Sequence, residues 1–162
     1  MRLVSINPQL SDYLHRSPEE TERDYRVALA GQTEQVRAVI DQTLDLIERV
    51  PRPRPFGGYL AVDSASGQVV GTCAFKGPPG PDGAIEIAYH TFQPYEGRGH
   101  ATDMARALIA LATSWPGVTR VIAHTLPAQS ASTTVLTKAG MRMVGEVDDP
   151  EDGRVWRWQH QG

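Results

Sequence analysis

Residues 84–112, AIEIAYHTFQPYEGRGHATDMARALIALA, determine the fold that this sequence predicts. The first nine, residues 84–92, are rich in β-branched and aromatic side chains, which is typical of a strand, and Pro94 ends it. The segment EGRGHA, residues 96–101, is typical of a tight glycine turn. Apolar residues then recur at helical spacing as far as Ala112. The stretch therefore predicts a strand, a glycine turn and a helix in direct succession.

The predicted turn has the chemistry of a phosphate site. The first N–H groups of a helix lack intrahelical partners, and the helix dipole adds partial positive charge at the same end. Such an end binds phosphate readily. Gly97 and Gly99 have no side chain, so a ligand can approach their backbone closely. Arg98 and His100 add positive or potentially positive charge.

Nucleotide motifs match this turn only in part. The pattern GxxxxGK[ST] is absent, which disfavours a P-loop. The dinucleotide pattern GxGxxG is met only by Gly97 and Gly99, because residue 102 is Thr. The residues alone leave the phosphate ligand open, and a nucleotide-binding module that uses the turn in another way remains a rival.

Three motifs carry a resemblance to a known family. Glu96-x-x-Gly99-x-Ala101 resembles the Gln/Arg-x-x-Gly-x-Gly/Ala signature of the GNAT superfamily of acetyl-CoA-dependent N-acetyltransferases. The strand segment 86–89, EIAY, looks like the fourth strand of that family. Residues 126–146, LPAQSASTTVLTKAGMRMVGE, resemble the Asn-x-x-Ser…Val-Leu-x-Lys-x-Gly-Phe segment of the branch with the ribosomal-protein N-terminal acetyltransferases. Their order and spacing match the family over residues 59–158.

The order of elements predicts one acetyltransferase domain over residues 1–162. We expect an α/β (α+β) fold, a GNAT-like mixed, mostly antiparallel twisted sheet of about seven strands with helices on both faces. The expected strands are 2–6, 59–62, 69–75, 84–92, 118–126, 141–147 and 154–159. The expected helices are a broken region within 9–31, then 33–50, one from 101, and 130–139, with Ser17 and Thr33 as N-caps.

Glu86 is the candidate general base. Strand alternation alone could place it toward solvent, but the resemblance implies a glutamate in the cleft that acts directly or through a water. The acceptor amine is protonated at neutral pH and must lose a proton before it attacks a thioester. His90 on the same strand is a second candidate base.

Ser132 is the second candidate catalytic residue. It matches the Ser of the family's Asn-x-x-Ser segment, although a serine in a first helical turn is also common. Many relatives carry a tyrosine that protonates the leaving thiolate, and here Leu136 stands at that position. The general acid is therefore either missing or replaced, with Ser132 as the candidate replacement.

The resemblance implies acetyl-CoA as co-substrate. It implies a backbone splayed from its neighbour at residues 90–92, with N–H groups near Thr91 and Phe92 on the pantetheine arm and the oxyanion. It also implies phosphate contacts at the turn and the start of the helix. The implied cofactor-binding residues are His90, Thr91, Phe92, Gly97, Arg98, Gly99, His100, Ala101, Thr102, Gln129 and Lys138.

Three departures support a different function. Glu96 replaces the usual Gln or Arg, Gln129 replaces the usual Asn, and Leu136 replaces the Tyr. A catalytically degenerate CoA-binding sensor or regulatory module is therefore the alternative to an enzyme.

Composition limits the partners. The net charge of −3 does not indicate nucleic-acid binding. The single cysteine, Cys73, cannot form a disulfide or a cysteine-based zinc site within the chain, and the histidines lack metal-ligand spacing, so we expect no metal. No apolar run approaches a membrane span, and residues 1–12 lack the apolar part of a secretory signal. We expect a cytoplasmic location without a membrane partner.

The sequence says least about the identity of the acceptor substrate. The resemblance implies a primary amine, as a small molecule or a peptide or protein N-terminus, without naming it. The acidic run 148–152 is either a solvated turn or an attractor for cationic amines. Whether the chain forms a homodimer is open.

Overall fold

A single sheet joins the seven strands of the computed structural model, which describes residues 1–160. The strand order is β1-β2-β3-β4-β5-β7-β6, and all neighbours are antiparallel except the parallel pair β4 and β5. This confirms the predicted mixed, mostly antiparallel sheet. The bounds are β1 Arg2–Ser5, β2 Gly58–Val62, β3 Val69–Phe75, β4 Ala84–Thr91, β5 Arg120–Thr125, β6 Arg142–Asp149 and β7 Gly153–His160.

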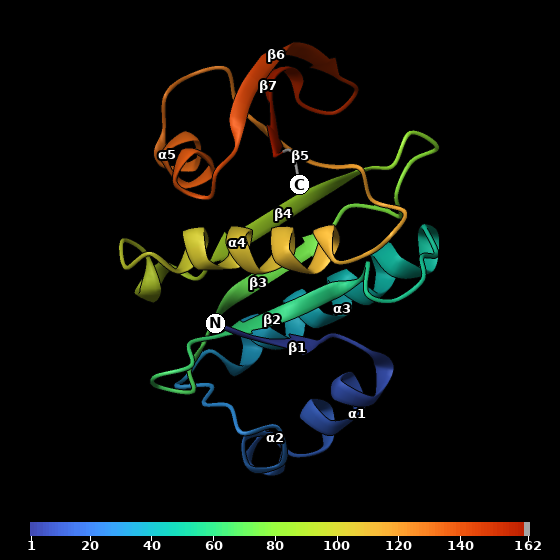
Figure 1. Ribbon diagram of the computed structural model, residues 1–162. Helices are drawn as coiled ribbons and strands as arrows, with labels where there is room; N and C mark the ends of the chain where they lie inside the picture. Colours follow the sequence, from blue (N-terminus) through green and yellow to red (C-terminus); the bar gives the residue numbers. More distant parts are fainter. Residues whose placement is uncertain (161–162) are drawn as a thin grey trace.

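The helices cover both faces of the sheet, as predicted. Figure 1 shows α4 in front of β3 and β4, and α3 on the opposite face, behind β2 and β3. Helices α1 and α2 lie with α3, and α5 lies beside β6 and β7. The bounds are α1 Pro8–Arg16, α2 Pro18–Tyr25, α3 Thr33–Arg49, α4 His100–Thr113 and α5 Ala131–Lys138, with a 3₁₀ turn at Gln93–Tyr95.

The helix starts follow the capping rules with one exception. Ser17 caps α2 as predicted, accepting the N–H of Glu20, and Pro18 is the first helical residue. The predicted cap Thr33 is wrong, because Thr33 is already inside α3. Gln32 is the cap residue there and makes no side-chain cap bond.

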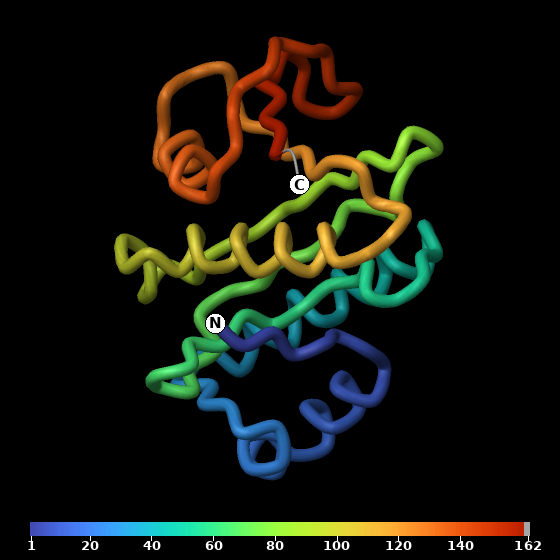
Figure 2. Tube along the Cα trace, in the orientation of Figure 1, coloured from blue at the N-terminus to red at the C-terminus, as the bar shows by residue number. Residues whose placement is uncertain are grey.

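Two apolar clusters hold these layers together. Between the sheet and α4, the buried side chains include Ile85, Ile87, Met104 and Leu108. A second cluster joins α1 and α3 to the first three strands, with Leu10, Leu14, Val36, Ile40, Leu60 and Phe92. Full burial of one such side chain stabilises the fold by about 1.5–3 kcal/mol. Figure 2 shows the N-terminal helices and the C-terminal hairpin at opposite ends of the sheet.

Strands β4 and β5 diverge soon after they begin. Their parallel pairing joins only Ala84–Glu86 to Arg120–Ile122. From Ile87 onward, β4 is paired with β3 alone in the described chain. The separation that the resemblance implies at the end of this strand is therefore present.

Backbone groups of β4 point into this divergence. The N–H of Phe92 donates to a carbonyl of β3 at 2.8 Å, and the carbonyl of Glu86 accepts the N–H of Lys76 at 2.9 Å. Even-numbered residues of β4 thus direct their backbone groups toward β3. Alternation along a strand directs those of Tyr89 and Thr91 toward the side that β5 has left.

The C-terminal hairpin is longer than predicted. Asp148 pairs with Arg154 and Asp149 pairs with Gly153, so both aspartates belong to β6 rather than to a turn over 148–153. Gly153 has φ 73°, in the left-handed region that favours glycine, and begins β7. The acidic run is thus held partly in a strand.

Residues 1–160 contain neither a membrane-spanning helix nor a cluster of metal ligands. Within this part of the chain, no helix has the length and apolar character needed to cross a membrane. The same residues contain no group of three or more His, Cys, Asp or Glu side chains placed to share a metal ion.

Candidate active site

Two cavities meet where β4 and β5 diverge. One, of ≈ 820 Å³, follows the glycine turn, the start of α4 and the inner side of α5. The other, of ≈ 600 Å³, lies between β4, β5 and the β6–β7 hairpin. Tyr89 and Ser132 line both cavities and therefore mark their junction.

The larger cavity opens onto the N-terminus of α4. Gly97 and Gly99 have φ 75° and 86°, and Gly99 is the N-cap residue without a side-chain cap bond. The first N–H groups of α4 therefore have no side-chain acceptor from the cap. A Cβ built on either glycine would meet no atom within 4 Å, so a ligand has room above the turn.

Most of the predicted cofactor residues line this cavity. The Thr91 hydroxyl is buried and has no hydrogen-bond partner among residues 1–160, so it could bond a polar ligand atom. Glu96 also lines the cavity, as does the positively charged Lys138. The predicted residues on its wall are His90, Thr91, Gly97, Gly99, His100, Ala101, Thr102, Ser132 and Lys138.

Three predicted cofactor residues are placed differently. The side chain of Phe92 is fully buried in the second cluster, and its N–H is bonded to Val70 O, so the predicted oxyanion contact from Phe92 is wrong. Arg98 lies over the Tyr95 ring, 5.9 Å from its centroid, outside the residues that line the cavity. Gln129 also lies outside this lining and accepts the Thr133 hydroxyl at 3.0 Å.

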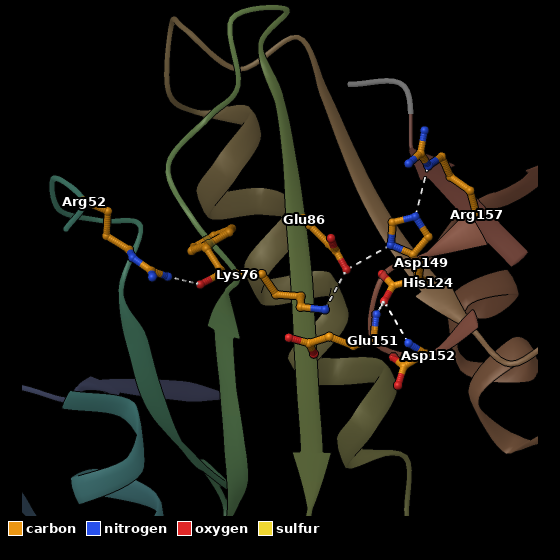
Figure 3. A network of polar contacts seen from close by, with 9 residues as sticks. Arg52, Lys76, Glu86, His124, Asp149, Glu151, Asp152 and Arg157 are labelled. Atoms are coloured by element: carbon orange, nitrogen blue, oxygen red, sulfur yellow. Dashed lines mark hydrogen bonds and ion pairs between the residues drawn. The ribbon is translucent and has the colours of Figure 1, made fainter. Parts of the chain in front are cut away.

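The smaller cavity contains Glu86 at the centre of a polar network, shown in Figure 3. Glu86 Oε2 lies 2.9 Å from His124 Nδ1 and 3.2 Å from Lys76 Nζ. Arg157 Nε donates to His124 Nε2 at 3.0 Å. Glu86 therefore faces the cavity from a fixed position and not bulk solvent.

Charges around the network are mainly acidic. Burial alone would lower the pKa of Lys76, but the carboxylates of Glu86, Asp149 and Asp152 together outweigh burial and raise that pKa above its ordinary value. Asp149 and Asp152 line the same cavity from the hairpin. Backbone N–H groups of Asp152 and Glu151 bond to Asp149 and lower its pKa, so it is ionised at neutral pH.

The sequence of this chain matches the family described as the acetyltransferase (GNAT) domain over residues 2–142. The chain belongs to the GNAT family. As a member, it is an acyltransferase. Comparison with curated protein sequences gives no match.

Solved structures of other GNAT proteins share the fold. The ribosomal L7/L12 α-N-protein acetyltransferase RimL in complex with coenzyme A has TM-score 0.64 at 15% identity, over 98% of this chain and 92% of its own. A GNAT acetyltransferase from Bacillus anthracis has TM-score 0.61 at 18% identity, over 80% of this chain and 74% of its own. The aminoglycoside acetyltransferase AAC(6')-Ib with ribostamycin and coenzyme A has TM-score 0.56 at 23% identity. That alignment covers 65% of this chain and 63% of the other.

Several site residues of this GNAT protein were missed by sequence reasoning. Lys76 follows β3, His124 lies on β5 and Arg157 on β7, and none belongs to a motif. The signal that existed was polar residues in strands that are otherwise apolar. Tyr89 was also missed as a junction residue, and burial raises its pKa to about 12, which keeps the phenol protonated.

Two other predicted features can be placed. Leu136 is buried in the core, so the position of the family tyrosine contributes no proton donor. Cys73 is buried, and burial raises the pKa of its thiol to about 12, so this thiol is an inert part of the core.

Proposed function

We propose that this GNAT protein transfers acetyl from acetyl-CoA to a primary amine by direct attack, with Glu86 as general base. One observation supports this most: the Glu86 carboxylate lies in a cavity that joins the cavity at the glycine turn. Cofactor and amine could therefore meet near Tyr89 and Ser132.

The residues of the larger cavity fit acetyl-CoA. The N-terminus of α4 and Lys138 would hold its phosphates. The unpaired Thr91 hydroxyl and the backbone edge of β4 would bond the amide groups of the pantetheine arm, much as an added strand would. Gly97 and Gly99 leave the space that the phosphates need.

The chemistry follows from these positions. Glu86 accepts a proton from the acceptor ammonium, and the freed amine nitrogen forms a bond to the thioester carbon. One N–H on the free edge of β4, that of Tyr89 or of Thr91, holds the oxyanion. The C–S bond then breaks, and Ser132 relays the second proton of the attacking nitrogen to the thiolate, which leaves a neutral amide and a free thiol. A thiol of pKa near 8.5 leaves readily, so a weak acid suffices.

The acceptor cavity favours cations. Asp149 and Asp152 stand with Glu86 against the single positive charge of Lys76 on its wall. A small-molecule amine with further positive charge, or a peptide N-terminus, fits this balance. A single domain, a cytoplasmic location and a homodimer stay predictions.

Glu86→Gln tests the proposal, because it keeps the size of the side chain and removes the base. We expect kcat/KM in an amine panel with thiol detection to fall about 10²–10⁴-fold. The rise in Tm that acetyl-CoA gives should be unchanged. Glu48→Gln, on the exposed face of α3, is the matched control.

Two results would contradict the proposal. Near-wild-type kcat/KM in Glu86→Gln would make His90 the next candidate base. A thermal shift with acetyl-CoA but no turnover with any amine would favour the regulatory CoA-binding module. Glu96 and the buried Leu136, which depart from the family pattern, are the residues that support this alternative.

A further inference from the structure

Four side chains form one continuous chain of polar contacts. They are Arg157 on β7, His124 on β5, Glu86 on β4 and Lys76, which follows β3. His124 on β5 pairs directly across the sheet with Arg157 on β7. Its ring bridges Arg157 Nε, at 3.0 Å, and Glu86 Oε2, at 2.9 Å. The His124 side chain is only 12% exposed, against 49% for Lys76, so solvent has little access to the ring.

The donors in this line determine where its protons are. A guanidinium has N–H donors and no acceptor, so His124 Nε2 must accept from Arg157 with its lone pair. The ring proton is then on Nδ1, where it donates to the Glu86 carboxylate. A protonated His124 would direct an N–H at the N–H of Arg157. The contacts therefore select the neutral Nδ1–H form of His124.

We propose that Arg157 and His124 are positioning residues for Glu86, and that they make Glu86, and not His124, the acceptor of the amine proton. The inference rests on the proposed function of Glu86. His124 cannot take up a proton without losing its bond to Arg157. The histidine beside the base is thus an orienting group.

The same contacts distinguish the two oxygens of Glu86. Oε2 binds both His124 and Lys76. For Oε1, the described residues provide no hydrogen bond or ion pair. Oε1 therefore receives the proton, while Oε2 stays anchored. The other charged groups near the His124 ring are the carboxylates of Asp149 and Asp152 on the hairpin, which line the same cavity.

The first test measures the tautomer in the resting protein. Long-range ¹H–¹⁵N correlation spectra of the full chain should show a protonated Nδ1 and an unprotonated Nε2 for His124. The spectrum of His124→Asn assigns the signal among the five histidines. A protonated Nε2 would overturn the inference. This readout needs neither acetyl-CoA nor turnover, so it stands apart from the fate of Glu86→Gln.

The second test separates orientation from packing. Asn can place its side-chain N–H near the position of His Nδ1, whereas Leu fills similar space without a donor. We expect His124→Leu to lower kcat about 10- to 100-fold, the loss of one hydrogen bond to a charged group, with the acetyl-CoA thermal shift unchanged. His124→Asn should recover most of that loss. Wild-type kcat in His124→Leu, or equal losses in both variants, would overturn the positioning role.

Discussion

The proposed cofactor side and the proposed acceptor side of this GNAT protein are built in different ways. The cofactor side comes largely from one continuous segment, residues 89–102, joined by one face of α5. The acceptor side is assembled from Lys76, Glu86, His124 and the hairpin residues, which are far apart in the sequence. A site built from one continuous segment can be recognised in the sequence as a motif. A site assembled from distant residues depends on how the strands are aligned, which the sequence does not show directly. The two sides should therefore respond to different substitutions.

The largest effect is expected at the glycine turn. Gly99→Val places a β-branched side chain at φ 86° and on the wall of the cofactor cavity. We expect the rise in Tm with acetyl-CoA to be lost or strongly reduced. Gly67→Val is the matched control, because Gly67 also has positive φ, at 75°, but lies in the turn before β3. An unchanged acetyl-CoA shift in Gly99→Val would show that the ligand binds elsewhere.

An intermediate effect is expected at the junction of the two cavities. Ser132→Ala should lower kcat about tenfold with little change in acetyl-CoA affinity, if its hydroxyl serves the leaving thiolate. Steady-state kinetics and thermal shift separate these quantities. Ser114→Ala at the end of α4 controls for the loss of a helix-end hydroxyl. A fall in affinity at constant kcat would reduce Ser132 to a cofactor contact.

The smallest effects are expected from substitution of the two lysines, and each should change the binding constant of only one substrate. The chain has two lysines, Lys76 in the acceptor cavity and Lys138 in the cofactor cavity. Lys76→Met removes an ammonium that competes with the acceptor for Glu86, so the acceptor KM should fall a few-fold, as expected for a half-exposed ion pair.

Lys138→Met should instead raise the acetyl-CoA Kd a few-fold and leave the acceptor KM alone. Titration of acetyl-CoA and initial rates over a range of amine concentrations measure both constants. If both variants change the same constant, the division into two sides is wrong.

The fold followed from the sequence because its signals are local. The glycine turn, the strand before it and the helix after it were each predicted within a few residues, as were the Ser17 cap and the hairpin. Helical and strand periodicities report burial directly, so they need no knowledge of distant residues. Thr33 failed as a cap because helix starts can shift by one residue without a change in apolar pattern.

Only part of the candidate site could be predicted, because the rest depends on contacts between residues that are distant in the sequence. Thr91 and Phe92 are neighbours in sequence, yet the two N–H groups point to opposite edges of β4, and only the structure shows which edge is free. His124 and Arg157 are hydrogen-bonded because β5 and β7 align in one register. A shift of one residue would turn either side chain to the other face.

The divergence of β4 from β5 also bears on how the two halves of the sheet move. Among the described residues, only three pairs of strand residues join the half of the sheet made by β1–β4 to the half made by β5–β7. The remaining links are a few bonds such as that between Glu86 and His124, and the packing of α4 and α5. A ligand that bonds to β4 on one side of the gap and to α5 on the other would connect the two halves of the sheet. Amide hydrogens along the free edge of β4 should then exchange more slowly in the complex, so that cofactor binding can be read as a local stiffening of the sheet.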